Sequence, residues 1–163
     1  SSDVCSSDLA HVASSQGEYV VETIMGHKPD LNHEHWPACV FTMTEVAQVG
    51  LTEEQLKEKG IDYRSSKFMF SANGKALSLG ETDGIIKILA SNENNRILGV
   101  HIIGPHANDL IHEGALAISN NMDVSAIKRT IHAHPTLSEA FFEAALGLDE
   151  AAIHIAPKKK RRG

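Results

Sequence analysis

The residues with the most distinctive chemistry lie near the end of the chain, in the run His-Pro-Thr-Leu-Ser-Glu over residues 134–139. Proline disfavours helical angles in the residue before it, so His134 is expected on an extended segment. Thr136 and Glu139 have the spacing of a capping box, which places a helix directly after them. The pattern therefore predicts an imidazole displayed at a helix entrance, with a carboxylate in the first helical turn.

Two interpretations of this arrangement follow from spacing alone. A carboxylate at Glu139 can hold one ring nitrogen of His134 and leave the other free for proton transfer near neutral pH. Alternatively, Glu139 only caps the helix and His134 is an ordinary surface histidine, because capping boxes are common. The residue pattern by itself leaves both interpretations open.

The elements that must position this pair follow from hydrophobic periodicity and turn residues. Helices are predicted over residues 10–25, 51–60, 107–118, 125–129 and 137–148, and strands over 40–42, 45–49, 63–71, 85–89 and 97–103. The last two strands form the clearest hairpin, and Thr52 with Gln55 gives a second capping box. Strands followed by helices, without a repeated strand–helix–strand unit, predict an α+β fold with an antiparallel sheet flanked by helices.

Composition narrows the class of protein. With 163 residues, 42% hydrophobic and 22% charged, the chain suits one soluble globular domain with loose ends. It has neither a signal peptide nor the run of about 18 apolar residues that a membrane span needs, so no membrane partner is expected. Its two cysteines form no disulfide framework, which favours a reducing, cytoplasmic setting.

The charge distribution argues against a nucleic-acid partner. The chain has 15 basic and 21 acidic residues, and five of the basic ones stand together at residues 158–162. The remainder is strongly acidic, whereas phosphate binding needs a basic surface. The basic run resembles a nuclear-import signal, but we expect a disordered tail over residues 156–163, because blocks of like charge repel.

Ten histidines raise the possibility of a metal site, most clearly at His27, His33 and His35. These three lie on a polar stretch without a nearby cysteine or a paired helix, whereas zinc sites need closely set ligands with fixed supporting contacts. We therefore expect a solvated loop there and no bound metal.

Several segments together resemble the flavin-dependent pyridine nucleotide–disulfide oxidoreductase family. Besides residues 134–139, the resemblance rests on residues 37–50, 68–73, 83–87 and 98–105, which occur in the family's order and spacing. It covers roughly residues 9–155. The resemblance implies an interface domain with an antiparallel sheet flanked by helices, which builds most of a two-fold homodimer.

The resemblance also implies roles for individual residues. His134 would be the acid/base that takes a proton from a dihydrolipoyl thiol, and Glu139 would orient its ring. The His134–Pro135 peptide would be cis and would contact the flavin of the opposite subunit, while Leu9, Ala10 and His11 would form a flavin-contacting turn. The implied cofactors are FAD and NAD, and the implied partner is the lipoyl-bearing acyltransferase of a 2-oxoacid dehydrogenase complex.

The chain lacks the family's Cys-x4-Cys redox motif and its two glycine-rich nucleotide turns. We therefore expect the C-terminal third of a longer enzyme, inactive by itself. The expected divisions are a linker or non-native scar at 1–8, a remnant of the FAD-binding region at 9–35, the dimerisation domain at 36–155 and the tail. Two alternatives remain: a related disulfide reductase of the glutathione or mercuric type, and a non-catalytic dimerisation or docking module.

Overall fold

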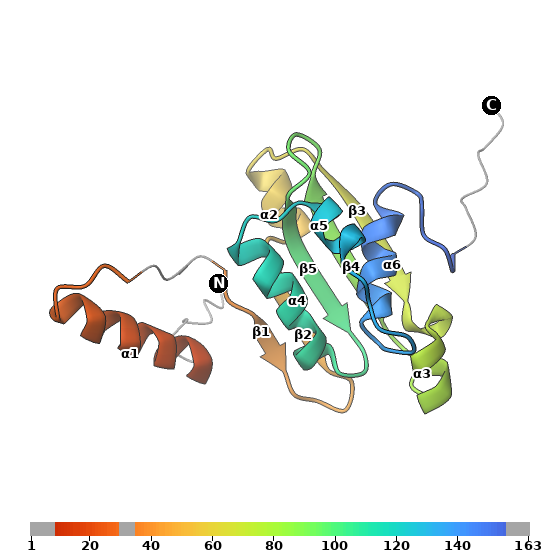
Figure 1. Cartoon of the computed structure of the whole chain (residues 1–163), viewed down its shortest axis with the longest axis horizontal. Helices are drawn as coiled ribbons and strands as arrows, with labels where there is room; N and C mark the ends of the chain where they lie inside the picture. The colour runs from red at the N-terminus through yellow and green to blue at the C-terminus, as the bar shows by residue number, and fades with distance from the viewer. Residues whose placement is uncertain (1–8, 30–34, 156–163) are drawn as a thin grey trace.

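A five-stranded antiparallel sheet forms the centre of the computed structural model (Figure 1). Its strand order is β1-β2-β5-β4-β3, with the bounds β1 Ala38–Val40, β2 Val46–Gly50, β3 Tyr63–Met69, β4 Ile85–Ser91 and β5 Ile97–Ile103. The predicted hairpin is therefore present as β4 and β5, which pair from Ile85 opposite Ile103 to Ala90 opposite Ile97.

The structure describes residues 9–29 and 35–155. The predictions for a linker at 1–8, for His33 and for a disordered tail at 156–163 lie outside the described residues.

Helices lie around this sheet and confirm the predicted α+β class. Their bounds are α1 Ala10–Ile24, α2 Glu53–Glu58, α3 Gly74–Leu79, α4 Ala107–Ser119, α5 Val124–Arg129 and α6 Glu139–Gly147, with a 3₁₀ turn at Phe70–Ala72. One face of the sheet is covered by α4, which packs on β2 and β5, and by α6, which packs on β3 and β4 (Figure 1). None of the helices in the described residues is long and apolar enough to cross a membrane.

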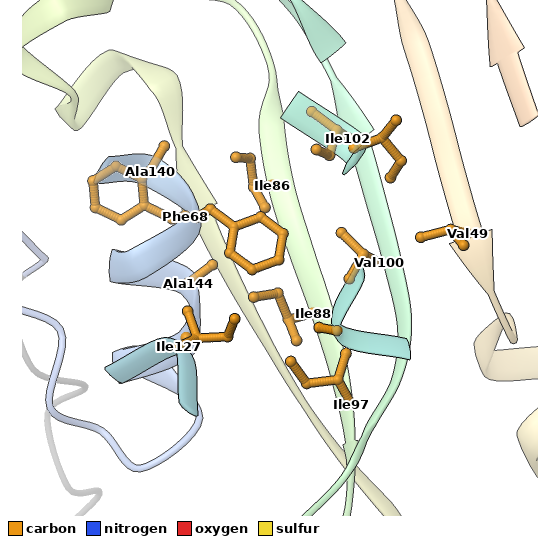
Figure 2. Close-up of a cluster of buried hydrophobic side chains, with 14 of the residues drawn as sticks. Val49, Phe68, Ile86, Ile88, Ile97, Val100, Ile102, Ile127, Ala140 and Ala144 are labelled. Carbon is orange, nitrogen blue, oxygen red and sulfur yellow. The ribbon is translucent and has the colours of Figure 1, made fainter. Parts of the chain in front are cut away.

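The core lies between the sheet and these two helices (Figure 2). Alternate residues of the strands point toward the helices, as the two-residue period of a strand requires. Phe68, Ile88 and Val100 are among the fully buried side chains of this face. Gly114 permits the close approach of α4, because a Cβ at that position would lie 2.9 Å from a methyl carbon of Val100.

Four of the five predicted strands differ from the structure in their bounds, and two of these differences have a local cause. The first strand is Ala38–Val40 rather than residues 40–42, because the Thr42 hydroxyl donates to the carbonyl of Thr44 at 2.6 Å and closes a turn there. The third strand ends at Met69 rather than at residue 71. Its partner turns away at Gly84, whose φ of +124° departs from extended backbone, so the pairing stops at Met69 opposite Ile85.

The helix predicted over residues 51–60 is present as α2, Glu53–Glu58. The Thr52 hydroxyl accepts the Gln55 N–H and the Gln55 side chain accepts the Thr52 N–H, so this capping box is confirmed. Helix α4 ends at Ser119 with Asn120 as its C-cap, one residue beyond the predicted 107–118. Helix α3 was missed, although Asn73 caps its start and Gly80 ends it in the left-handed conformation.

The opposite face of the sheet carries His101, whose Nε2 lies 3.1 Å from the carbonyl oxygen of Leu51. Burial lowers the pKa of the His101 imidazole, and the hydrogen bond to Leu51 only partly opposes that effect. An unfolded histidine takes up a proton near pH 6.5, so between pH 7 and pH 5 the unfolded chain binds more protons at this position than the folded chain. Lowering the pH from 7 to 5 therefore lowers the free energy of unfolding through His101.

We expect His101→Gln to remove part of the stability loss between pH 7 and pH 5. The difference should amount to about 1.4 kcal/mol for each unit by which the folded and unfolded pKa values differ. Urea unfolding of both proteins at pH 8, 7, 6 and 5 measures it, with pH 8 as the baseline because both states are then neutral. A difference between the two proteins that does not change with pH would contradict the prediction.

Candidate active site

The segment between α5 and α6 presents His134. Its His134–Pro135 peptide bond is cis, as the family resemblance implied. Inside the segment, the Thr136 hydroxyl donates to the carbonyl of Ala133 at 2.7 Å. From outside, the Asn73 side-chain amide donates to the Thr136 carbonyl at 3.1 Å. These contacts give an irregular segment a defined path immediately before α6.

The structure brings the two predicted catalytic residues together. Nδ1 of His134 lies 2.9 Å from a carboxylate oxygen of Glu139, and the other oxygen accepts the Thr136 N–H at 2.8 Å. The His134 side chain is 78% exposed, whereas that of Glu139 is 24% exposed. Among the described residues Nε2 of His134 has no hydrogen-bond partner, so this nitrogen faces outward and is available for proton transfer.

The electrostatics keep Glu139 ionised. Burial by itself would raise the pKa of the Glu139 carboxyl, but the hydrogen bonds from Thr136 and His134 outweigh burial and lower that pKa. The imidazole of His154 acts in the same direction. A carboxylate that stays charged holds the Nδ1–H form of the His134 ring and stabilises the ring once it becomes protonated.

The predicted capping box at this site is only half present. Glu139 accepts the Thr136 N–H, but the Thr136 hydroxyl donates to Ala133 instead of accepting an N–H of the helix. The helix consequently begins at Glu139 rather than at residue 137, with Ser138 as an N-cap that makes no side-chain bond. Glu139 therefore divides its two oxygens between the backbone and His134.

Two further histidine–glutamate pairs lie around α6 and were not predicted. Nε2 of His132 lies 2.8 Å from Glu113, and Nδ1 of His154 lies 2.6 Å from Glu143. The Glu143 carboxylate is 4% exposed and also accepts the N–H groups of Ile153 and His154. Its place within the apolar stripe of α6 was the one available signal, because a lone acid on such a face needs a partner.

The other candidate residues lie elsewhere. Leu9 is the N-cap of α1 and Ala10 is its first residue, while Nε2 of His11 lies 2.8 Å from the carbonyl of Pro37. Helix α1 lies beyond the β1 edge of the sheet, on the side opposite α6 (Figure 1). The structure therefore does not bring these three residues together with His134 within one chain.

Metal-binding chemistry has no cluster to support it in the described part of the chain. His27 pairs with Glu22, and His35 lies shortly before β1. Within residues 9–29 and 35–155, no three His, Cys, Asp or Glu side chains gather in a way that would hold a metal ion.

Comparison with known proteins decides the family. Residues 36–145 match the model of the pyridine nucleotide-disulphide oxidoreductase dimerisation domain. The chain belongs to this family. The matched segment contains the whole sheet, α4, and both His134 and Glu139. The family fold of an antiparallel sheet flanked by helices is thus the one observed.

Similar proteins within the family are dihydrolipoyl dehydrogenases. Dihydrolipoyl dehydrogenase 1, mitochondrial, of Arabidopsis thaliana is 47% identical over 147 residues, which make up 90% of this chain and 29% of that protein. The dihydrolipoyl dehydrogenase of Chlamydia muridarum is 43% identical over 152 residues, covering 93% of this chain and 33% of that protein. The chain spans about a third of the length of the curated relatives it matches.

Solved structures of the family share the fold. LpdA from Mycobacterium tuberculosis superposes with a TM-score of 0.81 at 27% identity, over 86% of this chain and 31% of that one. The HOCl-induced flavoprotein disulfide reductase RclA from Escherichia coli gives 0.78 at 22% identity, over 84% and 32%. At that identity the second likeness concerns the fold alone.

Proposed function

We propose that this chain supplies the dimer interface and the acid–base pair of a dihydrolipoyl dehydrogenase, a flavoprotein that oxidises protein-bound dihydrolipoamide with FAD and NAD. The observation that carries the proposal is the His134–Glu139 pair, joined at 2.9 Å with Nε2 of His134 directed outward. The similarity to dihydrolipoyl dehydrogenases over 90% of the chain supports the choice of substrate.

The chemistry of a dithiol substrate suits this pair. A thiol must lose its proton before its sulfur reacts, and its ordinary pKa of about 8.5 leaves it mostly protonated at neutral pH. Nε2 of His134 accepts that proton, and Glu139, bonded to Nδ1, stabilises the imidazolium that forms. The ring must later pass that proton on toward solvent, so that it is neutral again for the next turnover.

The first turn of α1 fits the flavin contact proposed for Leu9, Ala10 and His11. Leu9 provides no side-chain cap and the turn contains no acidic residue, so the positive end of the helix dipole is left for electron-rich carbonyl oxygens. Bound FAD would supply the electron acceptor, with NAD as the final one. Helix α1 lies beyond the β1 edge of the sheet, whereas the segment of His134 leads into α6, which packs on β3 and β4 toward the other edge (Figure 1). The proposed site therefore needs the His134 of a second subunit.

The remaining assignments belong to the same proposal. A homodimer is supported by the matched dimerisation domain, and the lipoyl-bearing acyltransferase of a 2-oxoacid dehydrogenase complex by the relatives' substrate. The cytoplasmic setting stays a prediction; the Arabidopsis relative is named mitochondrial. A disulfide reductase acting on glutathione or mercuric ion is the alternative, and a non-catalytic docking module is another.

To test the proposed function, the coding sequence is expressed together with its upstream reading frame. Purified protein is assayed for NAD reduction with dihydrolipoamide, and for reduction of glutathione disulfide and mercuric ion with reduced nicotinamide cofactors. We expect NAD reduction with dihydrolipoamide, and no reduction of glutathione disulfide or mercuric ion. Activity confined to glutathione disulfide or mercuric ion would replace the proposal with that alternative, and a flavin-free dimer without activity would favour the docking module.

A further inference from the structure

Two histidines in the segment of residues 130–138 differ strongly in solvent exposure. The His134 side chain is 78% exposed, whereas the His132 side chain, two residues earlier, is 6% exposed. The role proposed above uses only the exposed one. The buried one therefore needs its own explanation.

His132 connects three helices. Its Nε2 lies 2.8 Å from Glu113 on α4, and its Nδ1 lies 3.0 Å from the carbonyl of Thr130, the C-cap of α5. Its ring also packs on Phe142 of α6, with ring centroids 5.2 Å apart and the planes inclined by 33°. The side chain thus connects the segment to α4, to the end of α5 and to α6.

Both ring nitrogens of His132 have an oxygen atom within hydrogen-bond distance. The Thr130 carbonyl oxygen lies on the Nδ1 side and the Glu113 carboxylate on the Nε2 side. The side chain is 6% exposed, so these contacts form with little competition from water. Contacts on both sides of a buried ring fix its position, which suits an anchor.

A continuous set of contacts runs from this anchor to the reactive pair. The residue after His132, Ala133, accepts the Thr136 hydroxyl at 2.7 Å. The Thr136 N–H then donates to Glu139, whose other oxygen holds the ring of His134. A shift of His132 is therefore transmitted to both members of the pair.

We propose that His132 and Glu113 are positioning residues, which act on His134 by fixing the backbone that presents it and make no contact with substrate. The inference rests on the role proposed for His134. It concerns how that ring is held, so it is testable in the 163-residue chain without turnover.

The experiment breaks the anchor from each end. Glu113→Ala removes the carboxylate, and His132→Phe keeps an aromatic ring against Phe142 but loses both hydrogen bonds. Long-range ¹H–¹⁵N NMR of labelled histidine at pH 8 reports which nitrogen of His134 carries the proton. Amide exchange measures the backbone of residues 132–137, with Asp109→Ala, an exposed carboxylate on the same helix, as the matched control.

In both single variants we expect His134 to shift from the Nδ1–H toward the Nε2–H form, with exchange of residues 132–137 about tenfold faster. The double variant should add nothing further, because both changes break one connection. Wild-type signals from His134 in either folded variant would overturn the proposal. Equally faster exchange in β4 and β5 would overturn it too, since the effect would then be on the whole fold.

Discussion

Replacing His134 with glutamine in the full-length enzyme is expected to lower the rate of dihydrolipoamide oxidation by about 10²–10⁴-fold, the usual contribution of a general acid–base residue. Glutamine keeps a polar side chain that can still bond to Glu139, but it cannot take a proton from a thiol. The measurement is steady-state NAD reduction with dihydrolipoamide over a range of pH. The loss should fall on kcat.

The control is His27→Gln, which changes an exposed histidine outside the segment matched by the family. It should retain wild-type activity. Equal activity of His134→Gln and His27→Gln would remove the acid–base role and leave Glu139 with a structural function only. The half-formed capping box, in which one Glu139 oxygen accepts the Thr136 N–H, would then be the sole purpose of that carboxylate.

Phe68→Ala is expected to lower the free energy of unfolding by about 3–5 kcal/mol, the range for removing a buried phenylalanine. The Phe68 side chain is 1% exposed and lies between β3 and α6, among Ile86, Ile88 and Ala144 (Figure 2). Truncation leaves a cavity at the place where α6 packs on the sheet. Urea unfolding followed by circular dichroism measures the change.

The neighbouring residue provides the matched comparison. Met69 lies on the same strand but points to the opposite face, and its side chain is 48% exposed. Met69→Ala should change the free energy of unfolding by less than about 1 kcal/mol. Similar losses in the two variants would show that this face of the sheet does not hold the main core.

The parts of the fold that could be predicted from sequence are those with a local cause. The β4–β5 hairpin follows from two apolar runs around a polar loop, and α2 from the Thr52–Gln55 cap. Helix α3 was missed because its six residues are too few to show helical periodicity, although Asn73 and Gly80 mark both ends. In so short a helix, the cap residues indicate its position better than hydrophobic periodicity does.

The contacts of the candidate site also differ in whether they have a local cause in the sequence. The His134–Glu139 contact spans five residues. The spacing allowed this contact without deciding it, and the family resemblance favoured it. The contacts of His132 with Glu113, 19 residues away, and of His154 with Glu143, 11 residues away, depend on how α4 and the segment after α6 pack. Nothing in the sequence pattern relates those positions. Tertiary packing alone brings them into contact.

The two edge strands of the sheet, β1 and β3, limit how two copies of this domain can associate. Strand β1 has three residues and follows Pro37, which has no N–H to offer a further strand. At the other edge, β3 carries the exposed Lys67. If β3 paired with the β3 strand of a second copy about a two-fold axis, the two Lys67 side chains would lie close together and repel each other. We therefore expect the proposed homodimer to form through side chains of helices and loops, and not by one sheet continuing across the two-fold axis.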